Sequence, residues 1–278
     1  MIASAKRLAR RALKAAAAGA DRVRPPVPGV VVLVYHRVGG GTGLELDLPV
    51  ARFREQISVL AESGLVVSLG DALDGVAGRG SRSEGRPEWS VVITFDDGTA
   101  DFAEIAVPIL QAHALPVTLY AATAFIDEQR SFPYDGRPLT WSTLADACTT
   151  GLVDVGSHTH RHLLLDRAAP LVVSEELDRS VGLIEERLGR SAVDFAYPKA
   201  VAGSAAADRA VRARFRSAAL AGTRPNVPGR ADLFRLARSP VQLSDGMRWF
   251  DAKVAGGMAF EDTVRRLANR VRYARARA

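Results

Sequence analysis

The chain has 278 residues, a formal net charge of +6 and 47% hydrophobic residues. This composition is ordinary for a soluble globular protein, and one α/β barrel uses about 250 residues. The single cysteine, Cys148, excludes an intramolecular disulfide, and the longest apolar run, residues 30–35, is far too short to span a bilayer.

Positive charge is concentrated at the two ends of the chain. Residues 1–25 carry seven Lys and Arg against one Asp, and residues 259–278 carry six Arg against two acids, so the body between them is net negative. Helical periodicity over 3–18 predicts a basic helix, either solvated or lying on an anionic membrane surface. No continuous apolar segment of a signal peptide follows, so we expect a cytoplasmic protein. Peripheral contact with the inner membrane face is a further hypothesis.

Three segments are predicted from these shifts in composition. Residues 1–28 form a basic N-terminal helix and a Pro-rich linker, because the prolines at 25, 26 and 28 break the helix. Residues 29–258 form the main domain. Residues 259–278 form a basic C-terminal helix, whose periodicity extends over 259–275.

Short apolar runs alternate with helical periodicity along the main domain. The predicted strands are 30–35, 90–95, 116–122, 152–156, 193–197, 217–220 and 234–238. The predicted helices are 50–63, 69–76, 99–113 with a kink at Pro108, 142–150, 172–189 and 205–215, and a polar loop is expected over 78–87. This alternation favours a parallel α/β fold in a single domain.

Two adjacent acids end the second predicted strand. Residues 91–98 read VVITFDDG, an apolar and largely β-branched run that stops at Asp96, Asp97 and Gly98. Neighbouring side chains on a strand point to opposite faces, but at a strand end the chain can turn both into one cleft. Because the two acids repel, we expect one to have a positive partner, often a metal, and the other to handle protons.

Two histidines follow the predicted strand 152–156. His158 and His162 are four residues apart, so on one helix-like turn both imidazoles face the same way. Two histidines and one carboxylate form a familiar catalytic zinc shell with a position open for water. The plainer alternatives are that the acids cap the next helix and that the histidines lie in a surface turn. His160 is expected to be a bystander or a supporting group.

At these motifs the sequence resembles the polysaccharide deacetylases of the NodB-homology type, carbohydrate esterase family 4. Thr94-Phe95-Asp96-Asp97-Gly98 is similar to the first motif of that family, and His158-Thr159-x-x-His162 is similar to the second. The resemblance implies a distorted (β/α)7-type barrel. It also implies that Asp96 is the general base and that Asp97, His158 and His162 bind Zn²⁺ or another divalent transition metal.

The resemblance continues, with departures, over residues 193–200. It implies that the backbone N–H of Tyr197 helps to hold an oxyanion, although Lys199 and Ala200 replace the more common residues there. Family members often orient the base with an arginine, for which Arg235 and Arg238 are the candidates, a surface salt bridge being the alternative reading.

All of these candidates follow predicted strands, as does His36, which is either a packed side chain or a catalytic one. In a barrel, the carboxyl ends of the strands form one face, where the active site lies. That agreement is independent of the motif match. It favours one site built from His36, Asp96, Asp97, His158, His162 and Tyr197.

The predicted function is metal-dependent removal of N-acetyl or O-acetyl groups from a sugar, polysaccharide or lipid-linked glycan. The usual late motif of the family supplies a histidine as general acid, but this chain has no histidine after His162. Either His36 substitutes, or Asp96 returns its proton, or the protein is a weak or inactive relative that binds glycans. A small-molecule amidase or esterase is a further alternative. Nucleic-acid binding is not expected, because the body is acidic and has no known reader motif.

Overall fold

The computed structural model describes residues 2–78, 89–265 and 267. Within this part of the chain, seven parallel strands form a closed barrel, with neighbours in the order β1 (Val30–Tyr35), β4 (Ser90–Asp97), β5 (Val117–Ala121), β6 (Val153–Ser157), β7 (Asp194–Ala196), β8 (Ser217–Ala221) and β9 (Leu236–Pro240). The barrel closes where β9 pairs with β1, so that Val32 lies beside Arg238. The predicted fold, a single-domain (β/α)7-type barrel, is confirmed.

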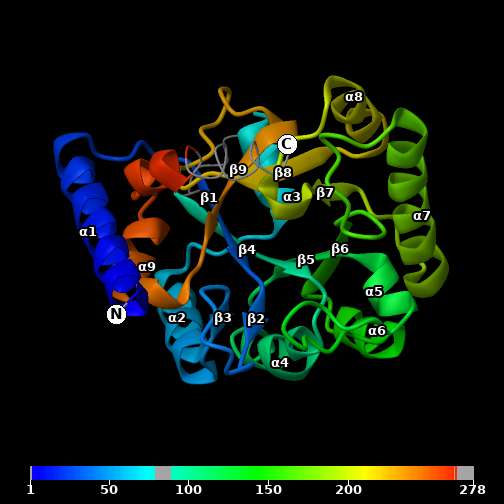
Figure 1. Cartoon of the computed structure of the whole chain (residues 1–278), viewed down its shortest axis with the longest axis horizontal. Coiled ribbons are helices and arrows are strands. Elements are labelled where there is room, and N and C mark those ends of the chain that lie inside the picture. The colour runs from blue at the N-terminus through cyan, green and yellow to red at the C-terminus, as the bar shows by residue number, and fades with distance from the viewer. Residues whose placement is uncertain (1, 79–88, 266, 268–278) are drawn as a thin grey trace.

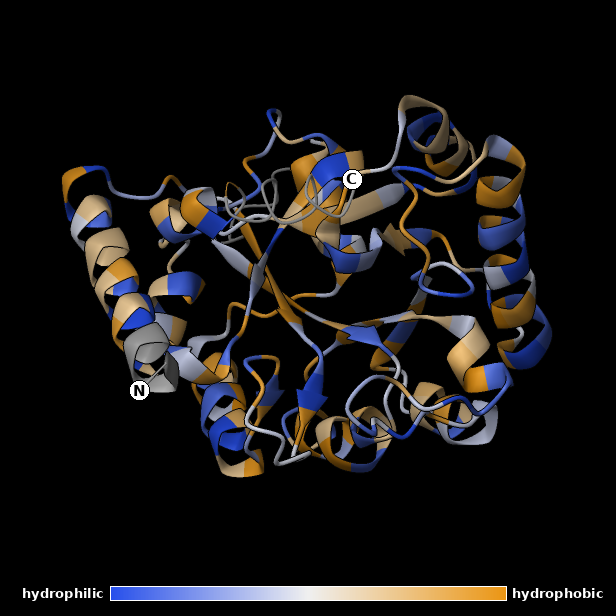
Figure 2. Ribbon diagram, viewed as in Figure 1, coloured by the Kyte–Doolittle hydropathy of each residue, from blue (hydrophilic) through white to orange (hydrophobic). Residues whose placement is uncertain are grey.

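Helices lie around the outside of the barrel (Figure 1). They are α1 (Ile2–Val23), α2 (Val50–Ser63), α3 (Leu69–Val76), α4 (Val107–Gln111), α5 (Thr123–Asp127), α6 (Trp141–Thr149), α7 (Pro170–Leu188), α8 (Ala205–Arg214) and α9 (Arg248–Val254). Figure 2 shows mixed hydropathy along them, most clearly in α7, as expected of helices with one face on a core. A short parallel pair, β2 (Arg37–Val38) and β3 (Asp47–Leu48), was not predicted.

An aromatic cluster packs beneath the end of β4. The rings of Tyr35, Phe53, Phe95 and Phe102 contact one another with centroids 5.1 to 5.8 Å apart. All four side chains are almost completely buried. Such aromatic pairs add about 0.5–1.5 kcal/mol each beyond the area they bury. The strand that carries Asp96 and Asp97 is therefore supported by a densely packed aromatic cluster.

Two predicted elements differ from the structure, and two others lie partly or mostly outside the described residues. The helix expected over 99–113 contains a π-helix, Phe102–Ala106, before α4, and the irregularity comes just ahead of Pro108, which has no N–H to bond back along the helix. The strand expected at 234–238 begins at Leu236, because a 3-10 turn, Leu233–Arg235, capped by Asp232, precedes it. In the expected final helix over 259–275, residues 259–265 and 267 are helical and the rest lie outside the described residues, as does the predicted loop over 78–87 except for Gly78.

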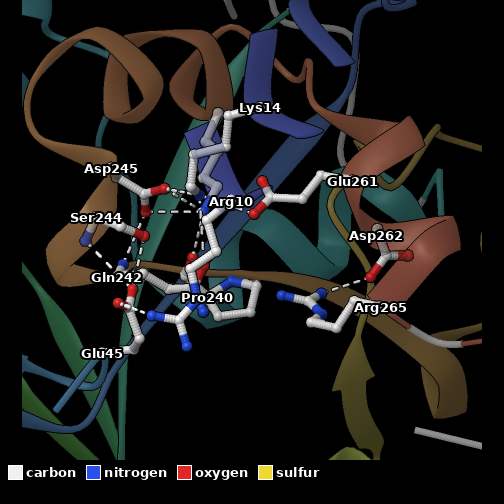
Figure 3. A network of polar contacts seen from close by, with 11 residues as sticks. Arg10, Lys14, Glu45, Pro240, Gln242, Ser244, Asp245, Glu261, Asp262 and Arg265 are labelled. Carbon is white, nitrogen blue, oxygen red and sulfur yellow. Dashed lines mark hydrogen bonds and ion pairs between the residues drawn. The ribbon is translucent and has the colours of Figure 1, made fainter. Parts of the chain in front are cut away.

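The N-terminal helix is fastened to the barrel by buried ion pairs (Figure 3). The Nζ atom of Lys14 lies 2.5 Å from Asp245 Oδ1 and 2.7 Å from Glu261 Oε1, and this lysine is 1% exposed. Asp245 also pairs with the fully buried Lys253 at 2.7 Å, and Lys253 donates to the Pro240 carbonyl at the end of β9. Most of the described α1 side chains are solvated, but one face of the helix is fastened to the barrel, so Lys14 is not available to a membrane surface.

The segment boundaries at residues 28 and 258 stay predictions. The same ion network joins the segments on both sides of them, since Lys14 comes from α1 and Glu261 from the chain after α9. Among the described helices, none combines the length and the apolar character that a membrane crossing requires.

Candidate active site and metal centre

A reversal of the backbone at the end of β4 brings the two acids into one cleft. The φ angles are +74° at Asp97 and +104° at Gly98, both left-handed. Glycine suits the second angle, and a Cβ there would lie only 3.1 Å from Ile126 Cδ1. As a result, one carboxylate oxygen each of Asp96 and Asp97 lies 3.8 Å from His158 Nε2.

The two histidines face Asp97 from the loop after β6. His158 is 1% exposed, and its Nδ1 donates to the carbonyl of Ala196 at 2.7 Å, which leaves Nε2 to face the cleft. His162 Nε2 lies 3.5 Å from Asp97 Oδ1. One ligand atom from each of Asp97, His158 and His162 lies within 4.8 Å of the others. The structure thus brings the three predicted metal ligands together.

The loop that carries these histidines is not the helix-like turn that their spacing suggested. Thr159 and His162 have φ angles of +62° and +58°, in the left-handed region. The hydroxyl of Thr159 holds this shape by accepting from the Leu163 N–H at 3.0 Å. His160 pairs instead with the Thr123 hydroxyl of α5 at 3.0 Å, which supports the loop and agrees with a role outside the ligand set.

The chemistry of the three ligands fits a divalent transition metal. Burial, with a smaller contribution from neighbouring His158, lowers the pKa of His162 to about 4, so its imidazole is neutral at pH 7. Metal ligation requires neutral imidazoles and an ionised carboxylate. Two imidazoles and one carboxylate are the ligands that zinc and related ions accept when they keep a further position for water.

Asp96 makes a different partnership, with a buried arginine. Arg238 is 2% exposed and binds Asp96 through two hydrogen bonds of 2.6 and 2.8 Å. Burial raises the pKa of the Asp96 carboxyl, but the guanidinium of Arg238 outweighs it and, with His158, holds that pKa well below its usual range. Arg235 instead meets Asp208 at the surface. Arg238 is therefore the arginine that orients Asp96.

His36 and Tyr197 have different outcomes. His36 Nε2 lies 3.9 Å from Asp96 Oδ2, and its buried Nδ1 has no hydrogen-bond partner among the described residues. The Tyr197 N–H donates to the carbonyl of Ala219 at 3.0 Å, and its ring packs on Phe195. Because β8 already occupies that N–H, the prediction that it holds the oxyanion is contradicted.

Comparisons with known proteins agree with this geometry. The sequence model of the polysaccharide deacetylase family matches residues 83–218. The resemblance to the polysaccharide deacetylases is confirmed. A search of curated proteins finds no significant match.

Several solved structures share the deacetylase fold. IcaB from Ammonifex degensii has a TM-score of 0.71 at 24% identity, over 83% of this chain and 98% of that one. The Streptococcus pyogenes deacetylase PplD, solved in complex with acetate, has a TM-score of 0.68 at 18% identity, over 82% and 99%. A de-N-acetylase from Aggregatibacter actinomycetemcomitans has a TM-score of 0.63 at 18% identity, over 81% and 99%.

Within this deacetylase fold, sequence reasoning missed Tyr120. Its ring lies 5.1 Å from the Arg238 guanidinium, and β5 places it directly beside Asp96. Its buried hydroxyl has no hydrogen-bond partner among the described residues. The alternation of polar Thr118 and Tyr120 with apolar Val117 and Leu119 was the available signal, because it indicates a strand face that is not purely apolar.

Proposed function

We propose that this protein is a metal-dependent hydrolase that removes N-acetyl or O-acetyl groups from a sugar, polysaccharide or lipid-linked glycan. The observation that carries the proposal is an arginine-bound carboxylate, Asp96, directly beside the ligand set of Asp97, His158 and His162. The family match supports the deacetylase class. The similar PplD, solved with acetate, and the similar de-N-acetylase support an acetyl group as the part removed.

Each side chain has a distinct task in this reaction. Asp97, His158 and His162 would hold Zn²⁺ or another divalent transition metal, which supplies a water of pKa about 7 and polarises the acetyl carbonyl. Asp96 accepts the proton of the attacking water. Because Arg238 keeps its pKa low, Asp96 is a weak base, and it suits only a water that has been made acidic in this way. Arg238 also fixes the direction of the carboxylate.

His36 is the side chain that we assign to protonation of the leaving group. It reaches within 3.9 Å of the Asp96 carboxylate, and its side chain is 19% exposed, so it lies between the base and the solvent. The alternative is that Asp96 returns the proton it accepted. Both routes agree with the lack of any histidine after His162.

His36→Gln is expected to lower kcat on acetylated sugar oligomers by about 10²-fold, because general acid catalysis contributes 10² to 10⁴. KM should change little, since the lost proton transfer acts on the transition state. The matched control is His113→Gln, which removes an exposed histidine in the turn after α4 and should leave kcat unchanged. An unchanged kcat in His36→Gln would assign the acid role to Asp96.

The test of the proposed function is acetate release from short GlcNAc oligomers, measured together with bound metal. Wild type should bind one divalent ion and release acetate, lose both after chelation, and recover both when zinc is restored. His158→Ala should not recover, because the ligand set is broken. Failure of the wild type to bind any metal would refute the proposal.

One further candidate function is favoured by a specific observation, the missing late histidine. A metal-containing but inactive relative would bind glycans without hydrolysing them, and would give bound metal with no acetate in the same experiment. Acetate released from simple esters but not from GlcNAc oligomers would indicate a small-molecule esterase. A cytoplasmic location stays a prediction.

A further inference from the structure

A hollow of about 620 Å³ lies at the pole of the barrel opposite the active site. Its lining residue Asn226 bridges to Val30, the first residue of β1, and its lining residue Arg235 immediately precedes β9. These are the amino ends of the strands, whereas the catalytic groups follow the carboxyl ends. One strand length, roughly 17–20 Å, therefore separates the hollow from Asp96.

The hollow carries an excess of positive charge. Four arginines line it, together with two carboxylates: Arg24, Arg224, Arg230, Arg235, Asp21 and Asp232. Asp232 is neutralised by Arg212 at 2.8 Å, whereas Asp21 accepts from the Met258 N–H at 2.7 Å and keeps its negative charge, so the arginines still outnumber the unpaired acid.

Three of these arginines make no polar side-chain contact with the described residues. Arg24, Arg224 and Arg230 are exposed, and their side chains have no hydrogen bond or ion pair with any residue that the structure describes. They come from the linker after α1 and from the β8–β9 connection, so the fold gathers them from distant parts of the chain.

Exposed apolar residues line the hollow or directly adjoin its lining residues in the sequence. Val27 lines the hollow and is 54% exposed. Val23, directly before Arg24, is 88% exposed, and Phe260, directly after the lining residue Ala259, is 46% exposed. Apolar side chains beside arginines are typical of a membrane interface, where the apolar groups enter the headgroup boundary and the cations meet phosphates.

We propose that this surface docks on a membrane that contains anionic phospholipid. We call it the basic pole and define it by Arg24, Arg224, Arg230, Val23, Val27 and Phe260. The guanidinium groups bind headgroup phosphates, for which their planar donor geometry is suited. The argument is charge complementarity. The basic pole is positively charged although the body of the chain is net acidic, and the headgroup phosphates that it would meet are negatively charged. This placement differs from contact through the whole N-terminal helix, whose Lys14 is buried and whose Arg10 pairs with Glu45.

Docking through the basic pole also fixes an orientation. Because the active site lies at the other ends of the strands, the catalytic face points away from the bilayer. The active site is then accessible to glycan chains that extend away from the membrane surface. It is not accessible to acetyl groups that lie within the headgroup layer. The proposal does not depend on the catalytic assignment, since membrane binding is measured without turnover.

The test is co-sedimentation of the full chain with vesicles at low salt. One set contains phosphatidylcholine alone and the other adds phosphatidylglycerol. The variant carries Arg24→Gln, Arg224→Gln and Arg230→Gln. The matched control carries Arg54→Gln, Arg179→Gln and Arg209→Gln, which removes the same charge from exposed sites on α2, α7 and α8. Thermal unfolding checks that both variants are folded.

Wild type should bind the anionic vesicles and not the neutral ones. The pole variant should bind roughly 100-fold more weakly, from about 1 kcal/mol for each basic residue near an anionic surface. The control variant should stay within a few-fold of wild type. Three results would overturn the proposal: no binding by wild type, equal losses in both variants, or arginine-dependent stabilisation by inorganic phosphate without vesicle binding, which would indicate a site for small anions.

Discussion

Asp96→Asn is expected to lower kcat for acetate release by about 10³-fold, within the range that general base catalysis contributes, and to leave metal binding intact. Asparagine has the shape of aspartate but cannot accept the proton of the attacking water. The three predicted ligands, Asp97, His158 and His162, are unchanged in this variant. The measurements are steady-state kinetics on GlcNAc oligomers and metal content on the same sample.

The matched control is the neighbouring acid, in the variant Asp97→Asn. It removes the carboxylate that lies 3.5 Å from His162 Nε2, so it should lower metal affinity as well as turnover. Unchanged metal content in Asp96→Asn and lowered metal content in Asp97→Asn would support the assignment of Asp96 as base and Asp97 as ligand. If Asp96→Asn released the metal and Asp97→Asn kept it, the two roles would have to be exchanged.

Arg238→Met is expected to have the largest effect on stability, about 3–5 kcal/mol, because it leaves a buried carboxylate without its cation. Asp96 is 5% exposed and takes two hydrogen bonds from Arg238. Without them, burial would raise the Asp96 pKa, since desolvation disfavours the charged form. Turnover should fall as well, because the carboxylate loses its fixed direction. Denaturant unfolding and kcat are the measurements.

The pH dependence of this effect has a definite sign. In wild type the folded-state pKa of Asp96 lies below its unfolded value, so its contribution to stability is present above about pH 4 and is lost as the pH falls further. The difference in unfolding free energy between wild type and Arg238→Met should therefore begin to shrink as the pH falls through the raised pKa of Asp96 in the variant, and it should shrink further below about pH 4, where wild type loses its contribution. Arg235→Met, which alters a surface pair, should cost no more than about 1 kcal/mol. Equal losses in the two variants would contradict the role given to Arg238.

Much of the fold was predictable because its signals are local. Apolar β-branched runs marked the strands to within about two residues, and the glycine after Asp97 marked the turn that ends β4. The ligand set was predictable from residue types and spacing. Its geometry was not, since the left-handed angles at Thr159 and His162 depend on side-chain contacts within a folded loop.

The remaining errors concern contacts between distant segments. The partner of the Tyr197 N–H is the carbonyl of Ala219, on the neighbouring strand, and strand register is not visible in a sequence. The choice between Arg235 and Arg238 depended on where β9 begins. Arg235 lies in the 3-10 turn before β9 and stays at the surface, whereas Arg238 lies within the strand and is buried.

Closure of the barrel by β9 has a consequence for biosynthesis. Arg238 lies 142 residues after Asp96 and is carried by the strand that completes the sheet against β1. Chains are synthesised from the N-terminus, and their early parts are available to fold first. On the ribosome, the candidate ligands Asp97, His158 and His162 are therefore synthesised before Arg238, the cation that pairs with Asp96. In the proposed mechanism, the general base acquires its cation only when β9 pairs with β1, so the proposed activity would require a closed barrel.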